Sequence, residues 1–358
     1  MQVTTIFESS ADASTAREPA IGDHWVIHDA LGKFRSKINK SDAKQFTFDR
    51  AYWSHDGFIT RKDGVLVPDG PNSPYVSQEM VFSDLGKGIL DNAFSGYACS
   101  LFAYGQTGSG KSYSVMGYGA NRGIVPIICQ QLFSRINECA ENDKEYQVTL
   151  SMLEIYNEQL RDLLVSDGSP ASKSLPVRQS PSSGFYVEGL KRIPVGSFEE
   201  IEQRMEQGTA RRTIAATNMN ATSSRAHTIV TLTFDQFTKK NGQNASRKRS
   251  VINLVDLAGS ERVTATGATG DRLKEGASIN RSLSVLGNVI SVMLSIIVAT
   301  RLHHEPSVCM CTKSPYTRYA YTEHSLFMPA VSQISLWILS LKTTFFPCLG
   351  TCLALVMK

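Results

Sequence analysis

A glycine-rich octapeptide restricts the possible folds of this 358-residue chain more than any other segment. It reads Gly105-Gln106-Thr107-Gly108-Ser109-Gly110-Lys111-Ser112 and fits the pattern G-x-x-x-x-G-K-[ST]. The octapeptide follows a strand-like apolar run and leads towards a helix, which is the context that a phosphate-binding loop requires. The alternative interpretation is a glycine-rich turn without a ligand.

The residue types of the octapeptide suit the chemistry of a nucleotide. Its glycines allow successive backbone N–H groups to converge on phosphate oxygens, and the helix N-terminus adds a favourable dipole. Lys111 supplies a compact positive charge for the β- and γ-phosphates, and the hydroxyl of Ser112 can bind Mg²⁺. The sequence therefore predicts a nucleotide site.

Strand-like runs alternate with helical stretches between about residue 46 and residue 290. The runs rich in β-branched and apolar residues cover 98–104, 148–156, 228–234 and 251–257. Helices are expected over 77–93, from near Pro126, and after a capping box formed by Ser197 and Glu200. This alternation predicts an α/β fold with a largely buried sheet.

Two further segments contain residue types that suit a bound nucleotide and metal ion. An apolar strand ends at Asp256, whose carboxylate can hold a Mg²⁺-bound water, and the amide of Gly259 can sense a γ-phosphate. Residues 220–227 place two adjacent hydroxyls next to Arg225 and His227, a set that can bind phosphate and metal. Taken singly, the acid is also typical of a turn and the hydroxyl cluster of a loop cap. Together, and in this order, the three segments favour a nucleotide site.

The three segments closely resemble the motifs of the kinesin motor domain. Residues 105–112 look like its phosphate loop, 220–227 like its switch I and 256–261 like its switch II. Residues 94–104, 153–158 and 276–283 also match, and 48–54 are similar to the kinesin-3 branch. The resemblance implies a P-loop NTPase fold in which helices flank a mixed central sheet. A small P-loop GTPase is a less suitable comparison because it lacks the paired switch segments.

The resemblance also implies ATP and Mg²⁺ as cofactors and gives roles to individual residues. The whole octapeptide would bind nucleotide, together with Ser223 and with Tyr113 beside the adenine, although Tyr113 can equally be an ordinary packed aromatic. Mg²⁺ would be held by Ser112, Ser223 and, partly through water, Asp256. The catalytic residues would be Ser224, Arg225, Gly259 and Glu261, with an ion pair between Arg225 and Glu261 closing both switches around the lytic water.

The function implied by the resemblance is a microtubule motor ATPase, which couples ATP hydrolysis to microtubule binding and movement in the cytoplasm, on the cytoskeleton. Arg272, Lys274 and Arg281 lie in the stretch that resembles the tubulin-facing region, whereas without the resemblance a solvated helix face is the favoured explanation. The net charge of +4 is too small to indicate nucleic acid. The second interpretation is a truncated, non-motile form that binds nucleotide or tubulin without stepping.

Both ends of the chain depart from the kinesin pattern. No N-terminal strand with the R-x-R-P motif is recognisable, and Ala226 stands where switch I usually has a serine. The resemblance stops after Ile290, so the last sheet strand and the neck linker are expected to be missing. The expected organisation is a divergent segment over 1–44, a partial motor domain over 45–290 and a divergent tail over 291–358.

Composition and loop patterns add several exclusions. With 42% hydrophobic residues the chain is not a disordered one, and Lys342, Pro347 and Gly350 interrupt the apolar tail, so a membrane span is not expected. The seven cysteines have no paired zinc-site spacing, which favours a reduced, intracellular protein without a structural metal. Residues 166–183 and 239–250 are expected to be loops. The second has five basic residues and suits a solvated hairpin tip or a contact with an acidic partner.

Overall fold

The computed structural model describes most of the first 290 residues and one short segment near the C-terminus. The described residues are 2–7, 25–28, 33–36, 45–47, 50–139, 143–165, 174–181, 184–218, 223–240, 243–261, 275–290 and 352–357.

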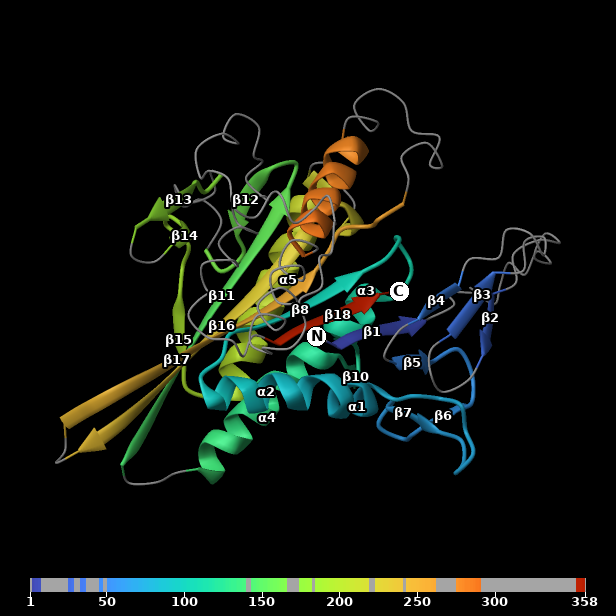
Figure 1. Ribbon diagram of the computed structural model, residues 1–358, viewed down its shortest axis with the longest axis horizontal. Helices are drawn as coiled ribbons and strands as arrows, with labels where there is room; N and C mark the ends of the chain where they lie inside the picture. Colours follow the sequence, from blue (N-terminus) through green and yellow to red (C-terminus); the bar gives the residue numbers. More distant parts are fainter. Residues whose placement is uncertain are drawn as a thin grey trace, which may run out of the picture.

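A mixed nine-stranded sheet forms the centre of the molecule (Figure 1). Its strands follow the order β12-β11-β16-β17-β8-β18-β1-β5, and β15 also pairs with β11. Strands β17, β8, β18, β1 and β5 pair in parallel, whereas β12, β11, β15 and β16 add antiparallel pairs. The bounds are β1 Gln2–Phe7, β5 Arg50–Trp53, β8 Cys99–Tyr104, β11 Lys144–Tyr156, β12 Gln159–Asp162, β15 Ile193–Val195, β16 His227–Lys240, β17 Gln243–Asp256 and β18 Cys352–Met357.

Two strands from the chain ends lie inside this sheet. Strand β18 pairs with β8, placing Cys352 opposite Cys99, and β1 pairs with β18, placing Gln2 opposite Ala354. This corrects the expectation that the sheet lacks an N-terminal strand and a last strand. Both positions are filled by segments without the family's motifs. The sequence of β18, Cys-Leu-Ala-Leu-Val-Met, is a continuous apolar run of the kind that central parallel strands contain.

Four small sheets surround the central one. They are β2 Trp25–His28 with β3 Lys33–Ser36 and β4 Gln45–Thr47, β6 Phe58–Thr60 with β7 Leu66–Pro68, β9 Gly117–Tyr118 with β10 Asn121–Arg122, and β13 Val177–Ser180 with β14 Gly184–Val187. The expected loop over 166–183 therefore includes a strand, β13, while 166–173 and 182–183 lie outside the described residues.

Helices pack on both faces of the sheet. Alternate residues of a strand point to opposite faces, so a strand with apolar residues at successive positions contributes to an apolar cluster on each face. In β8, Leu101 and Ala103 belong to an apolar cluster with α2, α4 and α5, whereas Phe102 belongs to a second cluster with the helix over 275–290. Figure 1 shows α2 and α4 together in its lower part and helix 275–290, in orange, in its upper part. The helices are α1 Gln78–Val81, η1 Phe82–Gly86, α2 Lys87–Ser95, α3 Lys111–Val115, α4 Ile124–Glu138, α5 Phe198–Asn218 and η3 Ser223–Arg225.

The helix starts follow the capping signals in the sequence. The Ser197 hydroxyl accepts a hydrogen bond from the backbone N–H of Glu200 at 3.3 Å, and the Glu200 carboxylate accepts one from the Gly196 N–H at 2.7 Å. This reciprocal pair confirms the predicted capping box. Its one difference is that the Glu200 carboxylate accepts from the N–H of Gly196 rather than from that of Ser197. The helix expected over 77–93 is present but contains the π-helical turn η1. Helix α4 begins at Ile124, so Pro126 lies in its first turn, where a missing N–H has no cost.

The basic segment expected to be a loop over 239–250 is mostly strand. Strands β16 and β17 form a long antiparallel hairpin, whose described part leaves only residues 241–242 between them. Arg247 and Arg249 each bind the buried carboxylate of Asp235 with two hydrogen bonds of 2.7–3.0 Å. Positions 235, 247 and 249 meet because Asp235 pairs directly with Arg249 in the register, and Arg247 lies two residues along the same face.

Replacement of Asp235 by alanine is expected to lower the free energy of unfolding by about 1–3 kcal/mol, because both half-exposed arginines lose charged hydrogen bonds to a buried partner. Urea unfolding measures the change. The matched control is Asp63→Ala, which removes a carboxylate bound by Arg61 at an exposed site and should cost no more than about 1 kcal/mol. Equal losses in the two variants would contradict the prediction.

The turn after α3 depends on Gly117. Its φ is +87°, and a Cβ there would lie 2.2 Å from the carbonyl oxygen of Asn121. Gly117→Ala is therefore expected to destabilise the β9–β10 hairpin by about 2–4 kcal/mol, since positive φ and a backbone clash add together. Gly119 has φ +56° and open space around it, so Gly119→Ala should lower the free energy of unfolding by only about 1–2 kcal/mol. Thermal unfolding of the two variants measures both changes.

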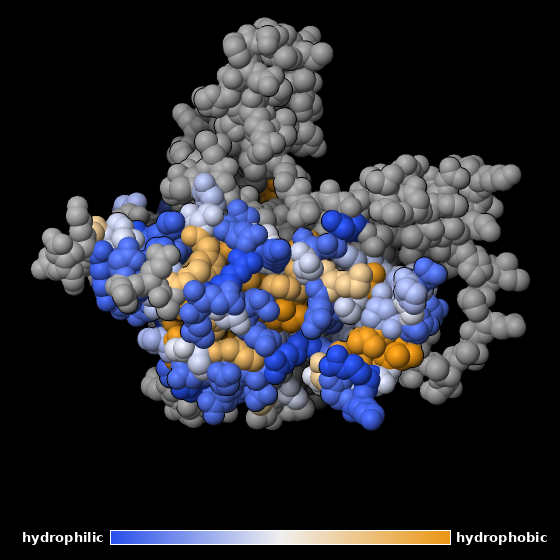
Figure 2. All heavy atoms as spheres, turned by 90° about the horizontal axis from the view of Figure 1, so that it is seen from below, coloured by the Kyte–Doolittle hydropathy of each residue, from blue (hydrophilic) through white to orange (hydrophobic). Residues whose placement is uncertain are grey.

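Among the coloured residues of the face shown in Figure 2, hydrophilic ones predominate, and apolar ones appear between them in separate patches. The large apolar side chains exposed among the described residues are Phe58, Ile59, Met80, Tyr118 and Tyr186. No helix in the described part of the chain combines the length and apolar character needed to cross a bilayer.

Candidate functional site

The predicted phosphate-binding loop lies between β8 and α3. Gly108 and Gly110 have φ of +80° and +84°, so the loop adopts left-handed backbone angles that glycine tolerates best. Lys111 begins α3 with only 7% of its surface exposed, and its Nζ donates to the carbonyl oxygen of Gln106 at 2.8 Å. Burial lowers the pKa of Lys111. The strand, loop and helix thus have the order that the sequence predicts.

Ser109 provides a buried polar atom inside this loop. Its hydroxyl oxygen has no hydrogen-bond partner among the described residues, and the side chain is 9% exposed. Buried hydroxyls in native proteins are usually hydrogen-bonded, so an orphaned one next to Gly108 and Gly110 is consistent with a loop shaped to bind an anion.

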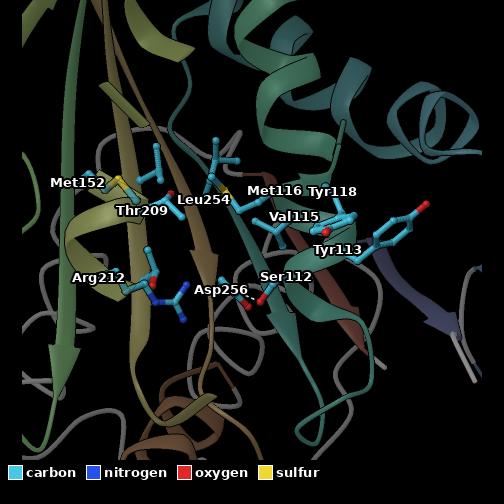
Figure 3. A pocket seen from close by; sticks show the side chains of 13 residues that line it. Ser112, Tyr113, Val115, Met116, Tyr118, Met152, Thr209, Arg212, Leu254 and Asp256 are labelled. Carbon is cyan, nitrogen blue, oxygen red and sulfur yellow. Dashed lines mark hydrogen bonds between the residues drawn. The ribbon is translucent and has the colours of Figure 1, made fainter. Parts of the chain in front are cut away.

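Ser112 and Asp256 meet although 144 residues separate them in the chain. Parallel pairing of β17 with β8 brings Asp256 opposite Ala103, at the end of the strand that leads into the loop. The Ser112 hydroxyl donates to the Asp256 carboxylate at 2.6 Å, drawn as a dashed line in Figure 3. Burial raises the pKa of Asp256, while the hydrogen bond from Ser112 and the charges of Arg212 and Lys111 act in the opposite direction.

These two residues fit a magnesium ion. A hydroxyl and a carboxylate are hard oxygen ligands, and Mg²⁺ keeps several of its waters when one or two protein groups bind it. The second carboxylate oxygen of Asp256 is buried without a hydrogen-bond partner among the described residues, and a cation or its waters would satisfy it. No group of three or more His, Cys, Asp or Glu suited to a metal occurs in the described part of the chain.

A cavity of about 440 Å³ continues behind this pair, between α3, α5 and strands β11, β16 and β17. Figure 3 shows Arg212 of α5 facing Asp256 across it, and Arg212 also pairs with Glu154 of β11 at 3.7 Å. Arg212 and Glu154 were missed from the sequence. Nothing in the consecutive arginines 211 and 212 indicates burial, and only the packing of α5 makes both partly buried, with Arg212 beside Glu154 and Arg211 donating to the Leu163 carbonyl oxygen at 3.0 Å.

The backbone connects all three sequence motifs. The Gly259 N–H donates to the Ser224 carbonyl oxygen at 2.8 Å, and the Ser260 N–H donates to the Gly105 carbonyl oxygen at 3.0 Å. Residues 105–112, 223–227 and 256–261 therefore lie next to one another. Ser223 begins η3.

Glu261 and Arg225 have partners that differ from the expected ion pair. The Glu261 carboxylate accepts hydrogen bonds from the N–H and hydroxyl of Thr107, at 2.9 and 2.7 Å. Burial raises the pKa of Glu261, but these bonds prevail and lower it overall. Arg225 binds Glu275 at 2.7 Å. The expected Arg225–Glu261 pair is thus not formed here, because Glu261 is held by the phosphate loop and Glu275 begins the adjacent helix.

Of the remaining predicted residues, two are described by the structure and two are not. Tyr113 follows the phosphate loop, and its carbonyl oxygen accepts a hydrogen bond from the Gln78 side chain at 2.8 Å. Arg281 is exposed on helix 275–290. Arg272 and Lys274 lie outside the described residues.

A family model described as the kinesin motor domain matches residues 9–306. The chain belongs to this family. Mouse "Kinesin-like protein KIF28" is 48% identical to this kinesin over 292 residues, which cover 81% of the chain and 28% of that protein. Human "Kinesin-like protein KIF13A" is 48% identical over 272 residues, which cover 75% of the chain and 14% of that protein. The kinesin described here thus spans less than a third of the length of these relatives.

Solved kinesin structures have the same fold. A KIF14 dimer in a two-heads-bound state, with AMP-PNP and in complex with a microtubule, matches 99% of this kinesin and 87% of its own chain, with a TM-score of 0.75 and 32% identity. A KIF14 structure with ADP, also in complex with a microtubule, matches all of this kinesin and 88% of its own chain, with a TM-score of 0.72 and 32% identity. The predicted P-loop kinesin fold with a mixed sheet and flanking helices is confirmed.

Proposed function

We propose that this chain is a microtubule-activated ATPase that couples ATP hydrolysis to movement. The observation that carries the proposal is the hydrogen bond between Gly259 and Ser224, which joins the two switch segments beside the phosphate loop. A γ-phosphate bound at Lys111 would lie where both segments can respond to it. The KIF14 structures, solved with AMP-PNP or ADP on microtubules, support the choice of nucleotide and partner.

In the nucleotide complex, the N–H groups of residues 108–112 bind the phosphates and Lys111 neutralises their charge. Ser112, Ser223 and, partly through water, Asp256 would hold Mg²⁺, which would neutralise further charge on the phosphates. Tyr113 lies beside the adenine. Little covalent chemistry is required of the protein, since phosphoryl transfer depends on positioning and charge.

Hydrolysis requires an exchange of partners around Arg225. In the arrangement seen here, Glu275 binds Arg225 and Thr107 binds Glu261. We propose that ATP releases Glu261 from Thr107 and that Arg225 then turns from Glu275 to Glu261. Ser224 and the Gly259 N–H would then position the lytic water and the γ-phosphate. Two carboxylates that compete for one arginine form a two-state element of the kind that switching needs.

The proposed tubulin-facing surface includes helix 275–290 and the segment before it. Arg272, Lys274 and Arg281 would supply positive charge to the acidic surface of a microtubule. This function places the protein on the cytoskeleton, in the cytoplasm. We also propose that residues 45–290 form the body of the motor domain, flanked by divergent segments over 1–44 and 291–358.

ATP turnover by the purified chain with increasing microtubule concentration tests this function. We expect turnover to rise at least tenfold to a plateau, and Mg²⁺ removal by a chelator to abolish it. Binding of ATP without stimulation would instead support a non-motile form, and binding of neither partner would contradict the proposal.

A further inference from the structure

His227 is the last residue of the switch I segment and the first of β16, and it contacts two other segments of the motor. Its side chain is buried, with 5% of its surface exposed. Nδ1 lies 3.1 Å from the backbone nitrogen of Ala258 in the switch II segment, and Nε2 lies 3.0 Å from the hydroxyl oxygen of Ser282 on helix 275–290. The residue itself follows Arg225 and Ala226 of switch I.

The donors and acceptors assign the proton on the ring. The Ala258 amide can only donate, so Nδ1 must be the unprotonated nitrogen that accepts. The neutral ring then has its proton on Nε2, which donates to Ser282, and the Ser282 hydroxyl donates in turn to the Ile279 carbonyl oxygen at 2.6 Å. Burial, and then the charge of Lys111, lower the pKa of His227 to about 4, so this neutral form persists at neutral pH.

The position of His227 makes it a link between the nucleotide and the helix. Ala258 immediately precedes Gly259, whose N–H donates to the switch I residue Ser224. On the other side, Ser282 neighbours Leu283, which packs with Leu286 in the apolar cluster under helix 275–290. Any shift of the switch II backbone must therefore move the ring and Ser282 with it, or break a buried hydrogen bond.

We infer that His227 is a positioning residue that couples movement of both switch segments to helix 275–290. The inference rests on the proposed function, because it describes how the nucleotide state reaches the tubulin-facing helix. Two part-buried contacts also join the switch segments to this helix, Arg225–Glu275 at 2.7 Å and the Asn280 side-chain amide to the Glu261 carbonyl oxygen at 3.3 Å, whereas the His227–Ser282 hydrogen bond is buried. Because a buried hydrogen bond is not replaced by water, its loss should weaken the coupling about threefold to tenfold.

Hydrogen exchange of the backbone amides over 275–290 tests the coupling without microtubules. The full chain is compared with Mg·ADP and with Mg·AMP-PNP. In the unmodified protein we expect exchange rates in this helix to differ between the nucleotides, and in Ser282→Ala we expect that difference to fall about threefold to tenfold. Absence of a nucleotide-dependent difference in the unmodified protein would overturn the inference.

Ser284→Ala is the matched control. Ser284 lies two residues further along the same helix, is exposed, and hydrogen-bonds the Asn280 carbonyl oxygen at 2.8 Å. Its replacement removes a similar hydroxyl without touching His227, so the nucleotide-dependent difference should remain. An equal loss in Ser282→Ala and Ser284→Ala would indicate general helix weakening and would overturn the inference.

Two replacements of His227 separate its two hydrogen bonds. Asn places an acceptor near the position of Nδ1 but is too short to reach Ser282, whereas Gln places a donor near the position of Nε2. His227→Asn should therefore lose the coupling as Ser282→Ala does, and His227→Gln should recover part of it. Because His227 and Ser282 act in one chain, the double variant His227→Asn/Ser282→Ala should lose no more than either single variant. Additive losses would contradict a shared link.

Microtubule-stimulated turnover separates this inference from the proposed function. If the unmodified protein is stimulated, Ser282→Ala should retain its basal turnover within about twofold and lose about threefold to tenfold of its stimulated kcat. Unchanged stimulation in Ser282→Ala would overturn the inference while leaving the proposed function intact. If the unmodified protein shows no stimulation, the proposed function fails, and the exchange experiment still decides the coupling.

Discussion

Lys111→Ala is expected to weaken binding of Mg·ATP by about 30- to 150-fold, which corresponds to about 2–3 kcal/mol for a hydrogen-bonded charge. The reason is the position of the amine, which is buried in the phosphate loop and held by the Gln106 carbonyl oxygen. Alanine has no amine, so the variant cannot supply this positive charge to the phosphates. Calorimetric titration of the purified chain with Mg·ATP measures the change.

Folding is not expected to explain the effect of Lys111→Ala. The variant loses a hydrogen bond but also removes a buried amine whose charge burial disfavours, so its melting temperature without nucleotide should change little. Lys62→Ala, at an exposed position away from the loop, should bind as the unmodified protein does. If Lys111→Ala held Mg·ATP as tightly as the parent protein, the phosphate site would have to be placed elsewhere.

Glu261→Ala is expected to lower kcat about 100-fold without raising the KM for ATP. In the structure Glu261 occupies the N–H and hydroxyl of Thr107, so its removal frees a phosphate-loop donor and takes away a negative charge. Binding of ATP should therefore not suffer. Hydrolysis should suffer, because Arg225 would have only Glu275 as a partner and the two switch segments would not close. Single-turnover measurements separate the two steps.

Glu188→Ala is a suitable control for that experiment, because Glu188 forms an exposed ion pair with Arg178 outside the site. It should change neither kinetic constant by more than about twofold. A Glu261→Ala variant that folds normally and hydrolyses ATP at an undiminished rate would rule out the proposed exchange of partners around Arg225.

Much of the fold follows from local patterns in the sequence. The strand before the phosphate loop, the loop itself and the capping box at Ser197 are confirmed within a residue or two. These features depend on residues within one helical turn or one strand, and short-range sterics and hydrogen bonds decide them. The prediction of a loop over 239–250 was wrong because a run of basic residues is also typical of a loop. In the structure this run belongs to strands β16 and β17, where Arg247 and Arg249 both bind Asp235.

Within the candidate site, the sequence indicated the residue types but not all of the partners. Ser112 and Asp256 meet, as the resemblance implies, because the parallel pairing of β17 with β8 sets the end of β17 beside the loop and helix that follow β8. The partner of Arg225 was not predictable from spacing. Glu261 and Glu275 both lie within reach of the switch segments, and the contact of Glu261 with Thr107 leaves Arg225 to Glu275.

The sequence by itself determined that a glycine-rich loop joins a strand to a helix, and it predicted that this loop binds phosphate and that two switch-like segments follow it. Only the tertiary structure decided that β18 and β1 complete the sheet, that Arg212 is buried opposite Asp256, and that His227 touches both Ala258 and Ser282. The physical reason is the range of the interactions. Caps, turns and strand periodicity act between near neighbours in the chain, whereas these pairings depend on the order in which distant strands and helices pack.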